Sequence, residues 1–399
     1  MNVIFLTLGR ITSLKQRGIY TDLMRLFLKQ QHDVYIVNPT ERKFGKKTIF
    51  RDVDGAHILS VNTLNIQKAS MIEKGLGIIL LEEQYKQAIK KYLRDVRFDL
   101  ILYTTPPITL ANVVYYLKKK NPNATSYLLL KDIFPQNAVD MGLFSEKSLL
   151  FKVFRRKEIQ LYKASDIIGC LSPANVEFLK KYNPYYPTER IEINPNSIEL
   201  SDKEKPDRNK ICQKYGLPKD KVIFIYGGNL GKPQGIDYVI RCMEDNVDKK
   251  DRHFLIVGTG TELPKLLKWY KFKKPLNVTV MEGLPKSEYD QLLQSCDVGL
   301  VFLDHHFLIP NYPSRLLSYM EFKMPVICAT DVNTDIGRIA EENGYGYWCE
   351  SKDPKCFTAL VDRMMLSDIK QMGEKGYDYL RNNYLVENTY NIIMSHIMH

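Results

Sequence analysis

The chain has 399 residues, of which 44% are hydrophobic and 26% charged, so it is a globular protein that is too long for one ordinary core and predicts two domains. Lysine and arginine number 57 against 46 aspartates and glutamates, and the resulting formal net charge of +11 suits nucleic acid, an anionic membrane or a phosphorylated substrate. The basic residues are dispersed and form no basic-aromatic module, so nucleic acid is the least favoured of these partners.

The apolar and cysteine patterns predict a cytoplasmic protein. No apolar run approaches the roughly 18–20 residues that a membrane-spanning helix needs. The run at residues 3–8 is short and no basic segment precedes it, which predicts a buried strand rather than a signal peptide. The seven cysteines are scattered without a C-x-x-C pair, which predicts reduced thiols and no structural zinc.

Strand and helix patterns alternate along the first half, as in an α/β protein. Short apolar runs predict strands at residues 3–8, 34–37, 100–103, 127–130 and 167–171. Amphipathic segments predict helices at residues 17–31, 80–94, 110–119, 147–163 and 173–181. The prolines at 106, 107 and 135 predict loops at 104–109 and 131–137. The polar stretch 194–220 breaks this rhythm and predicts the linker between two domains.

The second half restarts the alternation. It predicts strands at residues 222–226, 254–257, 278–281, 298–302 and 325–329, and helices at 235–243, 289–295 and 313–322. We therefore expect an N-terminal Rossmann-like domain at 1–200, a C-terminal one at 201–375, and a helix at 376–399 that packs back on the first domain. Such sheets bind ligands at the carboxyl ends of their strands, so two facing domains would enclose a substrate cleft.

A glycine-rich stretch at residues 226–235, YGGNLGKPQG, joins a predicted strand to a predicted helix. Backbone N–H groups and a helix N-terminus in such a loop present partial positive charge to a phosphate, and Lys232 adds a full charge. The pattern favours a diphosphate site. An ordinary strand-to-helix turn with a solvated lysine is the alternative.

Arg315 follows Pro313 and Ser314 in the first turn of a predicted helix. A cation is poorly placed there for the helix dipole, because cations favour the other end. A bound anion would offset that local cost. The alternative is a surface arginine with a carboxylate partner.

The sequence resembles the retaining family-4 glycosyltransferases of the GT-B fold over almost its whole length. The motifs that carry the resemblance are YGGNLGKPQGID, LIVGTGTELPKL, NVTVMEGLPKSEYDQLLQSCDVGLVFL and YPSRLLSYMEFKMPVICAT in the second half, and YTTPPIT, KDIFPQNAVDMG and IEINPNS in the first. They look most like the bacterial surface-polysaccharide branch, including the N-acetyl-L-fucosaminyltransferase-like enzymes.

The resemblance implies an α/β fold with two facing Rossmann-like domains and a C-terminal helix. It also implies transfer, with retention, of an N-acetylated or 6-deoxy amino hexose from a UDP-sugar. The implied acceptor is a polyprenyl-diphosphate-linked saccharide in capsule, O-antigen or exopolysaccharide biosynthesis. No metal or other cofactor is implied, since the departing diphosphate can take the acceptor proton and no strong base is needed.

The resemblance also implies roles for individual residues. Those facing the donor diphosphate are Gly228, Asn229, Lys232 and Gln234 in the glycine loop, Ser314 and Arg315 at the later helix, and Gly9 and Gly18 in the first domain. Those near the nucleobase or ribose are Glu282, Gly283, Leu284 and Ser318. Asp132 would face the sugar or the acceptor hydroxyl, and Asp132, Lys232 and Arg315 would carry catalysis. A loop cap before Pro135 is the alternative for Asp132.

The sequence departs from the family pattern at four places. Asn229 and Gln234 stand where many relatives have an Arg/Lys pair, so Lys232 and Arg315 become the expected cations. Pro310 and Ser318 stand where many relatives have two glutamates. The ribose contact would then depend on Ser318, and a contact to the sugar hydroxyls is left unassigned.

Two further segments suggest other interactions. Asp304, His305 and His306 predict a polar lining rather than a metal site, because adjacent histidines rarely converge on one ion without more ligands. Residues 147–157, KSLLFKVFRRK, suit a helix on an anionic membrane and equally a core helix with a basic face. A lipid-linked acceptor favours the membrane, and hence a peripheral position on the inner face of the plasma membrane. The alternative functions are a UDP-sugar 2-epimerase and a non-catalytic sugar-nucleotide-binding scaffold.

Overall fold

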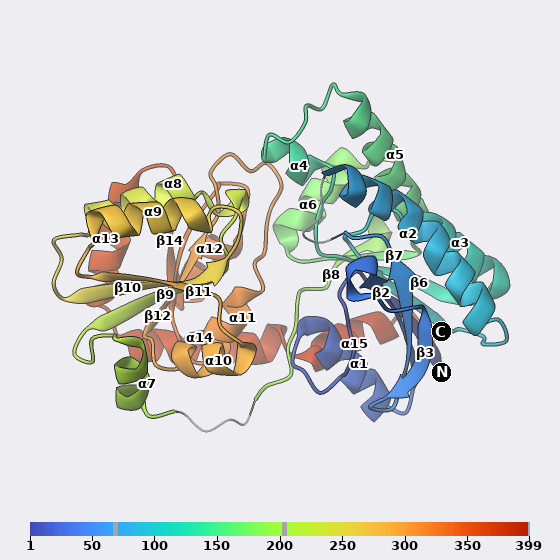
Figure 1. Cartoon of the computed structure of the whole chain (residues 1–399), viewed down its shortest axis with the longest axis horizontal. Helices are drawn as coiled ribbons and strands as arrows, with labels where there is room; N and C mark the ends of the chain where they lie inside the picture. The colour runs from blue at the N-terminus through green and yellow to red at the C-terminus, as the bar shows by residue number, and fades with distance from the viewer. Residues whose placement is uncertain (67–70, 202–205, 398–399) are drawn as a thin grey trace. The chain divides into compact units, whose positions relative to one another are not determined.

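The computed structural model describes residues 1–66, 71–201 and 206–397. The chain forms two compact units (Figure 1). Unit 1 comprises Met1–Glu199 and the segment from Leu385 onward, and unit 2 comprises Leu200–Tyr384. Each unit is an α/β structure built on its own sheet.

Unit 1 contains an eight-stranded sheet in the order β3-β4-β2-β1-β5-β6-β7-β8. Its strands are β1 Asn2–Leu6, β2 Asp33–Glu41, β3 Ile49–Val53, β4 Ala56–Thr63, β5 Leu100–Thr104, β6 Thr125–Leu130, β7 Ile167–Cys170 and β8 Ile191–Ile193. All neighbours pair in parallel except β3, which is antiparallel to β4. The central strands β5 and β6 are buried along almost their whole length, because helices cover both faces of a parallel sheet.

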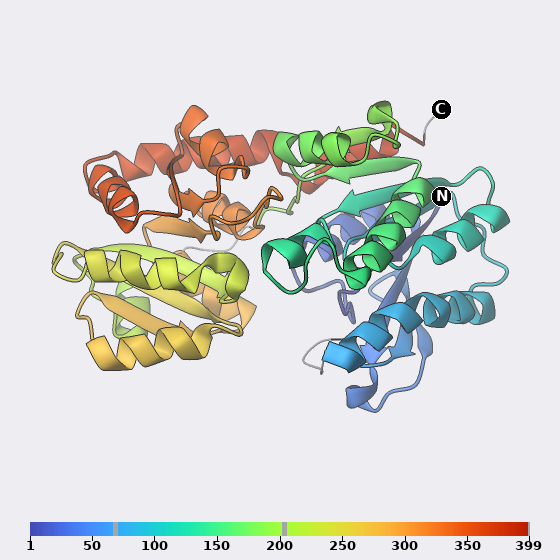
Figure 2. The same cartoon turned by 90° about the horizontal axis from the view of Figure 1, so that it is seen from above.

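The helices of unit 1 cover both faces of this sheet. They are α1 Ile19–Lys29, α2 Met71–Tyr92, α3 Ala111–Lys120, α4 Gln136–Asp140, α5 Leu149–Ala164, α6 Pro173–Tyr182 and α15 Val386–Met394, with 3-10 turns η1 Arg42–Phe44 and η2 Thr188–Arg190. Helices α2, α3 and α5 pack side by side, and α1 lies against α15 (Figure 1). The same layers are visible from above (Figure 2).

Unit 2 contains a six-stranded parallel sheet in the order β11-β10-β9-β12-β13-β14. Its strands are β9 Val222–Asn229, β10 Arg252–Thr259, β11 Val278–Glu282, β12 Val298–Phe302, β13 Val326–Thr330 and β14 Gly346–Glu350. Its helices are α7 Arg208–Tyr215, α8 Ile236–Asp245, α9 Leu263–Lys273, α10 Lys286–Leu293, α11 Arg315–Glu321, α12 Ile336–Glu342, α13 Pro354–Met365 and α14 Ile369–Asn383, with the 3-10 turn η3 Lys232–Gln234. Helices α8, α9 and α13 lie on one face, and α10, α11 and α14 on the other (Figure 1).

The structure differs from the sequence prediction at the ends of the second domain. The segment 376–399, expected as one helix after a domain ending at 375, is divided between two helices: α14 stays with unit 2, and only α15 packs in the core of unit 1. The predicted linker 194–220 contains the helix α7, which Asp207 caps by accepting from the Asn209 N–H at 2.9 Å. Its residues 202–205 lie outside the described part of the chain.

Candidate functional site

The loops expected at the donor site meet at one edge of the unit 2 sheet. The strand order reverses between β9 and β12, and such a reversal creates a crevice at the carboxyl ends of parallel strands. In register, Gly228 at the end of β9 lies opposite Gly258 of β10, which lies opposite Glu282 of β11. The ends of β9, β10 and β11, which are far apart in sequence, therefore form one surface.

Glycine is required where these loops approach one another. A Cβ on Gly258 would lie 2.0 Å from the Gly228 carbonyl oxygen, and Gly228 itself has a φ of +127°. The Leu230 N–H donates to the Thr259 carbonyl at 2.8 Å, which ties the glycine-rich loop to the end of β10. Because glycine has no Cβ, the backbone of the two loops can pack closely and form one side of the candidate site.

Asn229 and Gln234 hold the glycine-rich loop in shape. The buried Gln234 Oε1 accepts from the Gly231 N–H at 3.0 Å and from Asn229 Nδ2 at 3.1 Å. Gln234 was expected to face a diphosphate, but its side-chain oxygen is used inside the loop, so we assign it to positioning. Lys232, on the same loop, is exposed and makes no ion pair with any described residue.

Arg315 reaches the same edge from the start of α11. Its Cζ lies 4.3 Å from the centre of the Tyr226 ring and 3.5 Å from the position that a Cβ on Gly228 would take. Its Nη1 is buried without a hydrogen-bond partner, and no carboxylate of the described residues lies within ion-pair distance. Arg315 is therefore not a surface arginine with a carboxylate partner, and its guanidinium can bind an anion that reaches Gly228.

Two tyrosines that the sequence analysis did not select lie near Arg315 and contact the backbone at Gly227. Tyr319 is fully buried, and its hydroxyl contacts the Leu300 carbonyl at 3.1 Å and the Gly227 N–H at 3.3 Å. A Cβ on Gly227 would lie 1.8 Å from the Tyr289 hydroxyl. Spacing could have identified Tyr319, since residues four apart share one side of a helix. Nothing in the local pattern marks Tyr289.

The remaining residues expected near the donor lie around this edge. Glu282 and Gly283 are exposed at the end of β11, and Leu284 is half-buried after them. Ser314 is exposed directly before α11, and Ser318 is half-buried within it. Their expected contacts with a nucleobase, phosphate or ribose stay predictions.

Asp304, His305 and His306 follow β12 and come together beside the glycine-rich loop. Their ligand atoms lie within 4.8 Å of one another, and the Asp304 N–H donates to the Pro233 carbonyl at 2.9 Å. His306 Nδ1 lies 2.6 Å from Asp304 Oδ1. Within the described residues, no fourth His, Cys, Asp or Glu joins this group. The interpretation as a polar lining stays a prediction.

In unit 1 the expected residues lie at the carboxyl ends of β1 and β6. Gly9 follows β1, and a Cβ there would lie 3.8 Å from the Tyr20 ring. Asp132 follows β6 and lies near enough to Tyr20 to help raise the pKa of that phenol, after the larger effect of burial. Gly18 precedes α1, where its N–H donates to Asp22 Oδ1 at 3.0 Å.

Asp132 is half-buried and unusually basic for a carboxylate. Burial raises its pKa to about 6, although Asn137 Nδ2 donates to its Oδ1 at 2.6 Å. The bond to Asn137, in the short helix α4, agrees with the loop-cap interpretation. Its neighbour Lys131, which the sequence analysis missed, is also shielded from water, and this burial lowers the pKa of its ammonium group to about 7.

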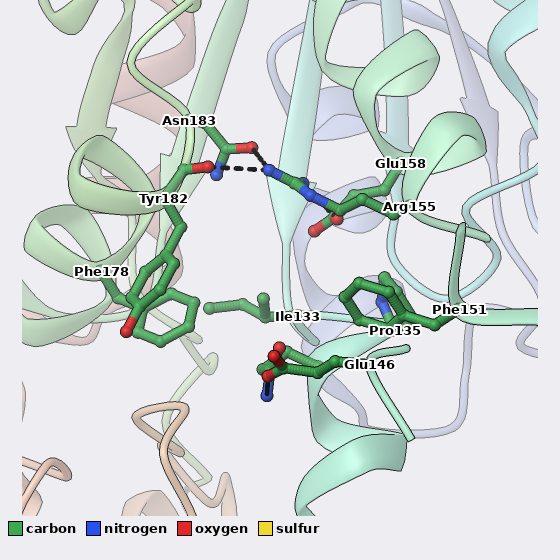
Figure 3. A pocket seen from close by; sticks show the side chains of 10 residues that line it. Ile133, Pro135, Glu146, Phe151, Arg155, Glu158, Phe178, Tyr182 and Asn183 are labelled. Atoms are coloured by element: carbon green, nitrogen blue, oxygen red, sulfur yellow. Dashed lines mark hydrogen bonds and ion pairs between the residues drawn. The ribbon is translucent and has the colours of Figure 1, made fainter. Parts of the chain in front are cut away.

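A separate pocket of about 170 Å³ lies in unit 1 between the loop after β6 and helices α5 and α6 (Figure 3). Phe151, Phe178 and Tyr182 contribute aromatic walls. Arg155 Nη2 donates to the Tyr182 carbonyl at 2.8 Å and to Asn183 Oδ1 at 2.6 Å. The guanidinium is therefore committed to the wall, unlike that of Arg315.

The two sheets, parallel apart from the edge strand β3 of the first and with a glycine-rich switch point in the second, have the architecture of a GT-B glycosyltransferase. Residues 207–379 match the Glycosyl transferases group 1 family. Over 359 residues the chain is 23% identical to the probable glycosyltransferase WbjE of Pseudomonas aeruginosa, and the alignment covers 88% of each chain. It is 27% identical over 138 residues to the putative colanic acid biosynthesis glycosyl transferase WcaI of Escherichia coli (strain K12), covering 34% of this chain and 33% of that one.

Among solved structures, Anabaena Alr3699/HepE in complex with UDP has a TM-score of 0.67 with this chain at 12% sequence identity, covering 99% of both. The predicted α/β GT-B fold with two Rossmann-like domains is thus confirmed. Together the similarities support a glycosyltransferase with a group 1 domain in its second half.

Proposed function

We propose that the chain is a retaining, family-4-like glycosyltransferase that moves a sugar from a UDP-sugar onto a lipid-linked saccharide. The donor sugar is an N-acetylated or 6-deoxy amino hexose, and the acceptor is a polyprenyl-diphosphate-linked saccharide in capsule, O-antigen or exopolysaccharide biosynthesis. Support comes from the motifs, from the names of the relatives WbjE and WcaI, and from the UDP bound by the similar HepE structure.

The observation that carries this proposal is the guanidinium of Arg315 beside Gly228, whose buried Nη1 has no hydrogen-bond partner and which forms no ion pair with a described residue. When the bond between sugar and diphosphate breaks, negative charge develops on the departing phosphate. A preorganised cation and backbone N–H groups stabilise that charge more than they stabilise the ground state, and this lowers the barrier. Lys232 adds a second positive charge from the exposed turn of the loop.

Asp132 has a different role in this mechanism. The departing phosphate takes the proton of the acceptor hydroxyl, so the reaction needs no strong protein base and no metal. A carboxylate with a pKa of about 6 is ionised at neutral pH and accepts a hydrogen bond from that hydroxyl, which orients the acceptor for attack.

Helix α5 provides the contact with the cytoplasmic face of the membrane. Leu149, Leu150 and Val153 are 80%, 49% and 54% exposed, and Lys152 and Arg156 are exposed near them. Apolar side chains with basic neighbours suit an anionic leaflet. The proposed contact is peripheral, and none of the described helices has the length and apolar character to cross a bilayer.

The test is to incubate the protein with a panel of UDP-, GDP- and TDP-sugars, with and without a polyprenyl-diphosphate saccharide. We expect UDP release that requires the acceptor. Arg315→Ala should lower kcat/KM about 10²- to 10³-fold, the usual effect of removing one group that stabilises the developing charge. Arg241→Ala, an exposed arginine on α8, is the matched control and should change little.

Each other outcome contradicts the proposal in its own way. A change of the donor sugar without acceptor would indicate an epimerase. Nucleotide-sugar binding without turnover would indicate a scaffold. Unchanged donor binding and turnover in both Arg315→Ala and Lys232→Ala would show that the glycine-rich loop is not the diphosphate site.

A further inference from the structure

A basic and aromatic segment of unit 2 lies away from the donor loops. Residues 268–276, KWYKFKKPL, form the last turn of α9 and the chain directly after it, and we call them the α9 tip. Helix α9 starts after β10, at the edge that carries the glycine loops, and its tip lies just before β11 begins, at the opposite edge. The proposed transfer reaction therefore gives the α9 tip no role.

Two large apolar side chains of the α9 tip project into solvent. Phe272 is 82% exposed and Leu276 is 94% exposed. Leu276 cannot turn inward, because Pro275 and Asn277 on either side of it are buried. Asn277 Nδ2 donates to the Asn246 carbonyl at 2.7 Å and to the Lys249 carbonyl at 3.0 Å, which anchors this part of the chain. The exposure is thus built into the fold.

Phe272 is held outward by the rest of α9. Leu263 and Leu266 are buried in the core of unit 2, and Trp269 and Tyr270 pack against that core. The Trp269 indole N–H donates to Glu244 Oε1 at 3.0 Å, which fixes the last turn of the helix to α8. Phe272 is therefore on a face of the helix that nothing in the described chain covers.

Basic groups surround these apolar side chains. Lys268, Lys271, Lys273 and Lys274 are all exposed, and the α9 tip contains no acidic residue. Lys273 lies 3.7 Å from Glu244, whereas the other three lysines make no ion pair with the described residues. Lys271 and Lys274 line a shallow hollow together with Tyr270 and Pro275.

Lysines in the last turn of a helix are favourable by themselves, because they complement the negative end of the helix dipole. That effect does not explain an exposed phenylalanine and an exposed leucine among them. A lipid surface accounts for both, since the apolar side chains enter the acyl boundary while the lysines stay among anionic headgroups.

We propose that the α9 tip is a second membrane contact, in which Phe272 and Leu276 insert into an anionic bilayer surface and Lys271 and Lys274 bind lipid phosphate. It is separate from the contact proposed for α5, because it lies on the other unit. Two linked contacts bind a surface more tightly than either one, so each unit would be retained at the membrane through its own residues.

The experiment is co-sedimentation of the full chain with phosphatidylcholine vesicles, with and without phosphatidylglycerol. Wild type should bind the anionic vesicles, and added salt should weaken that binding. Phe272→Ser with Leu276→Ser should weaken it about tenfold or more, and Lys271→Gln with Lys274→Gln should do so on anionic vesicles. Leu366→Ser, at a leucine that is 91% exposed without such a lysine cluster, is the matched control and should bind like wild type.

Several results would overturn the proposal. Both double variants could bind anionic vesicles as tightly as Leu366→Ser, which would leave α5 as the only contact. Loss of self-association in light scattering without a change in vesicle binding would instead identify a second copy of the chain as the partner. Binding of RNA in preference to vesicles would identify a nucleic-acid surface.

The proposal can fail independently of the transferase function. Transfer to a short-chain, water-soluble acceptor without vesicles should be equal in wild type and in both α9-tip variants. If no transfer is seen in any of them, the proposed function fails, while the vesicle experiment still reports on the α9 tip.

Discussion

Tyr319, one helical turn after Arg315, has a hydroxyl that replaces part of the sheet hydrogen bonding between β9 and β12. Strands β9 and β12 pair only at Phe224 and Ile225 of β9. Beyond these two pairs, the Tyr319 hydroxyl bonds to the Gly227 N–H and the Leu300 carbonyl instead. Tyr319→Phe leaves these buried backbone groups unsatisfied. We expect a loss of about 1–3 kcal/mol in the free energy of unfolding and a several-fold higher KM for the donor.

Two measurements check this role. Denaturant unfolding gives the free energy, and initial-rate kinetics separate KM from kcat. Tyr347→Phe, which also loses a hydroxyl contact, at 2.9 Å to Ser367, is the control and should leave the donor KM unchanged. A loss of stability without any change in donor KM would reduce Tyr319 to a purely structural residue.

Asp132 gives unit 1 a pH dependence that can be measured. Its pKa rises from 3.8 to about 6 through burial, so the folded state holds the proton more tightly than the unfolded state. This contribution to stability is complete below about pH 4 and is lost as the pH rises through about 6. The difference in free energy of unfolding between Asp132→Asn and wild type should therefore be more favourable to the variant at pH 8 than at pH 4, by at most about 3 kcal/mol.

The activity should show the opposite preference. The ionised carboxylate accepts a stronger, charge-assisted hydrogen bond from the acceptor hydroxyl than the protonated acid does, so the wild-type rate should rise as the pH passes about 6. Asp132→Asn should lower the rate and remove this rise. A pH profile of the variant that keeps the same inflection would assign the titration to another group.

At the scale of single residues, the sequence identifies chemistry better than contacts. Arg315 could be selected because a cation in the first turn of a helix is locally unfavourable. The hydrogen bond between Asn229 and Gln234 could not be predicted, since it requires the loop to fold back between positions five apart. Tyr289 reaches Gly227 only through tertiary packing of α10.

At the scale of elements, Gly258 shows how tightly the ends of β9 and β10 are packed. Gly258→Ala would place its Cβ 2.0 Å from the Gly228 carbonyl oxygen, and the backbone there cannot move without breaking the register. We expect a loss of about 1–3 kcal/mol in the free energy of unfolding and weaker UDP binding. Thermal unfolding and isothermal titration with UDP check both. Normal UDP affinity in a destabilised variant would show that the packing of Gly258 supports the fold but not UDP binding.

Elements with strong patterns were predictable and those with mixed patterns were not. The buried central strands of both sheets are short apolar runs, which periodicity detects. The hairpin of β3 and β4 was missed because β3 is largely exposed at the sheet edge, and the pattern Ile49–Val53 mixes apolar with charged residues. Helix α2 starts at Met71, well before the predicted residue 80, because Gly75 and Gly77 weaken its pattern.

At the scale of the whole molecule, the chain passes twice between the units, after Glu199 and after Tyr384. The sequence predicted a return to the first domain but not its position, because residues 376–399 were interpreted as one helix, whereas the return falls at Leu385 between α14 and α15. Leu385 pairs with Ile198 in a parallel bridge, and the Thr389 hydroxyl donates to Ser197 Oγ at 2.7 Å. These contacts fasten the end of the chain to the last segment of unit 1.

Helix α15 therefore contributes to the stability of unit 1, in whose core it packs. Ile393 is fully buried in the unit 1 core. Ile393→Ala leaves a cavity there and should cost unit 1 about 2–5 kcal/mol. The donor loops and Arg315 belong to unit 2, so UDP should stabilise unit 2 in the variant as it does in wild type, in proportion to its binding.

Hydrogen exchange with and without UDP distinguishes the two effects. Ile393→Ala should increase exchange in β1, β2 and α1, while protection of β9 and α11 by UDP is retained. Val361→Ala, at a buried residue of α13 in the unit 2 core, should show the reverse pattern. If Ile393→Ala also abolished the UDP-dependent protection, the two units would fold as one cooperative body, and the final helix would control the donor site as well as the unit on which it packs.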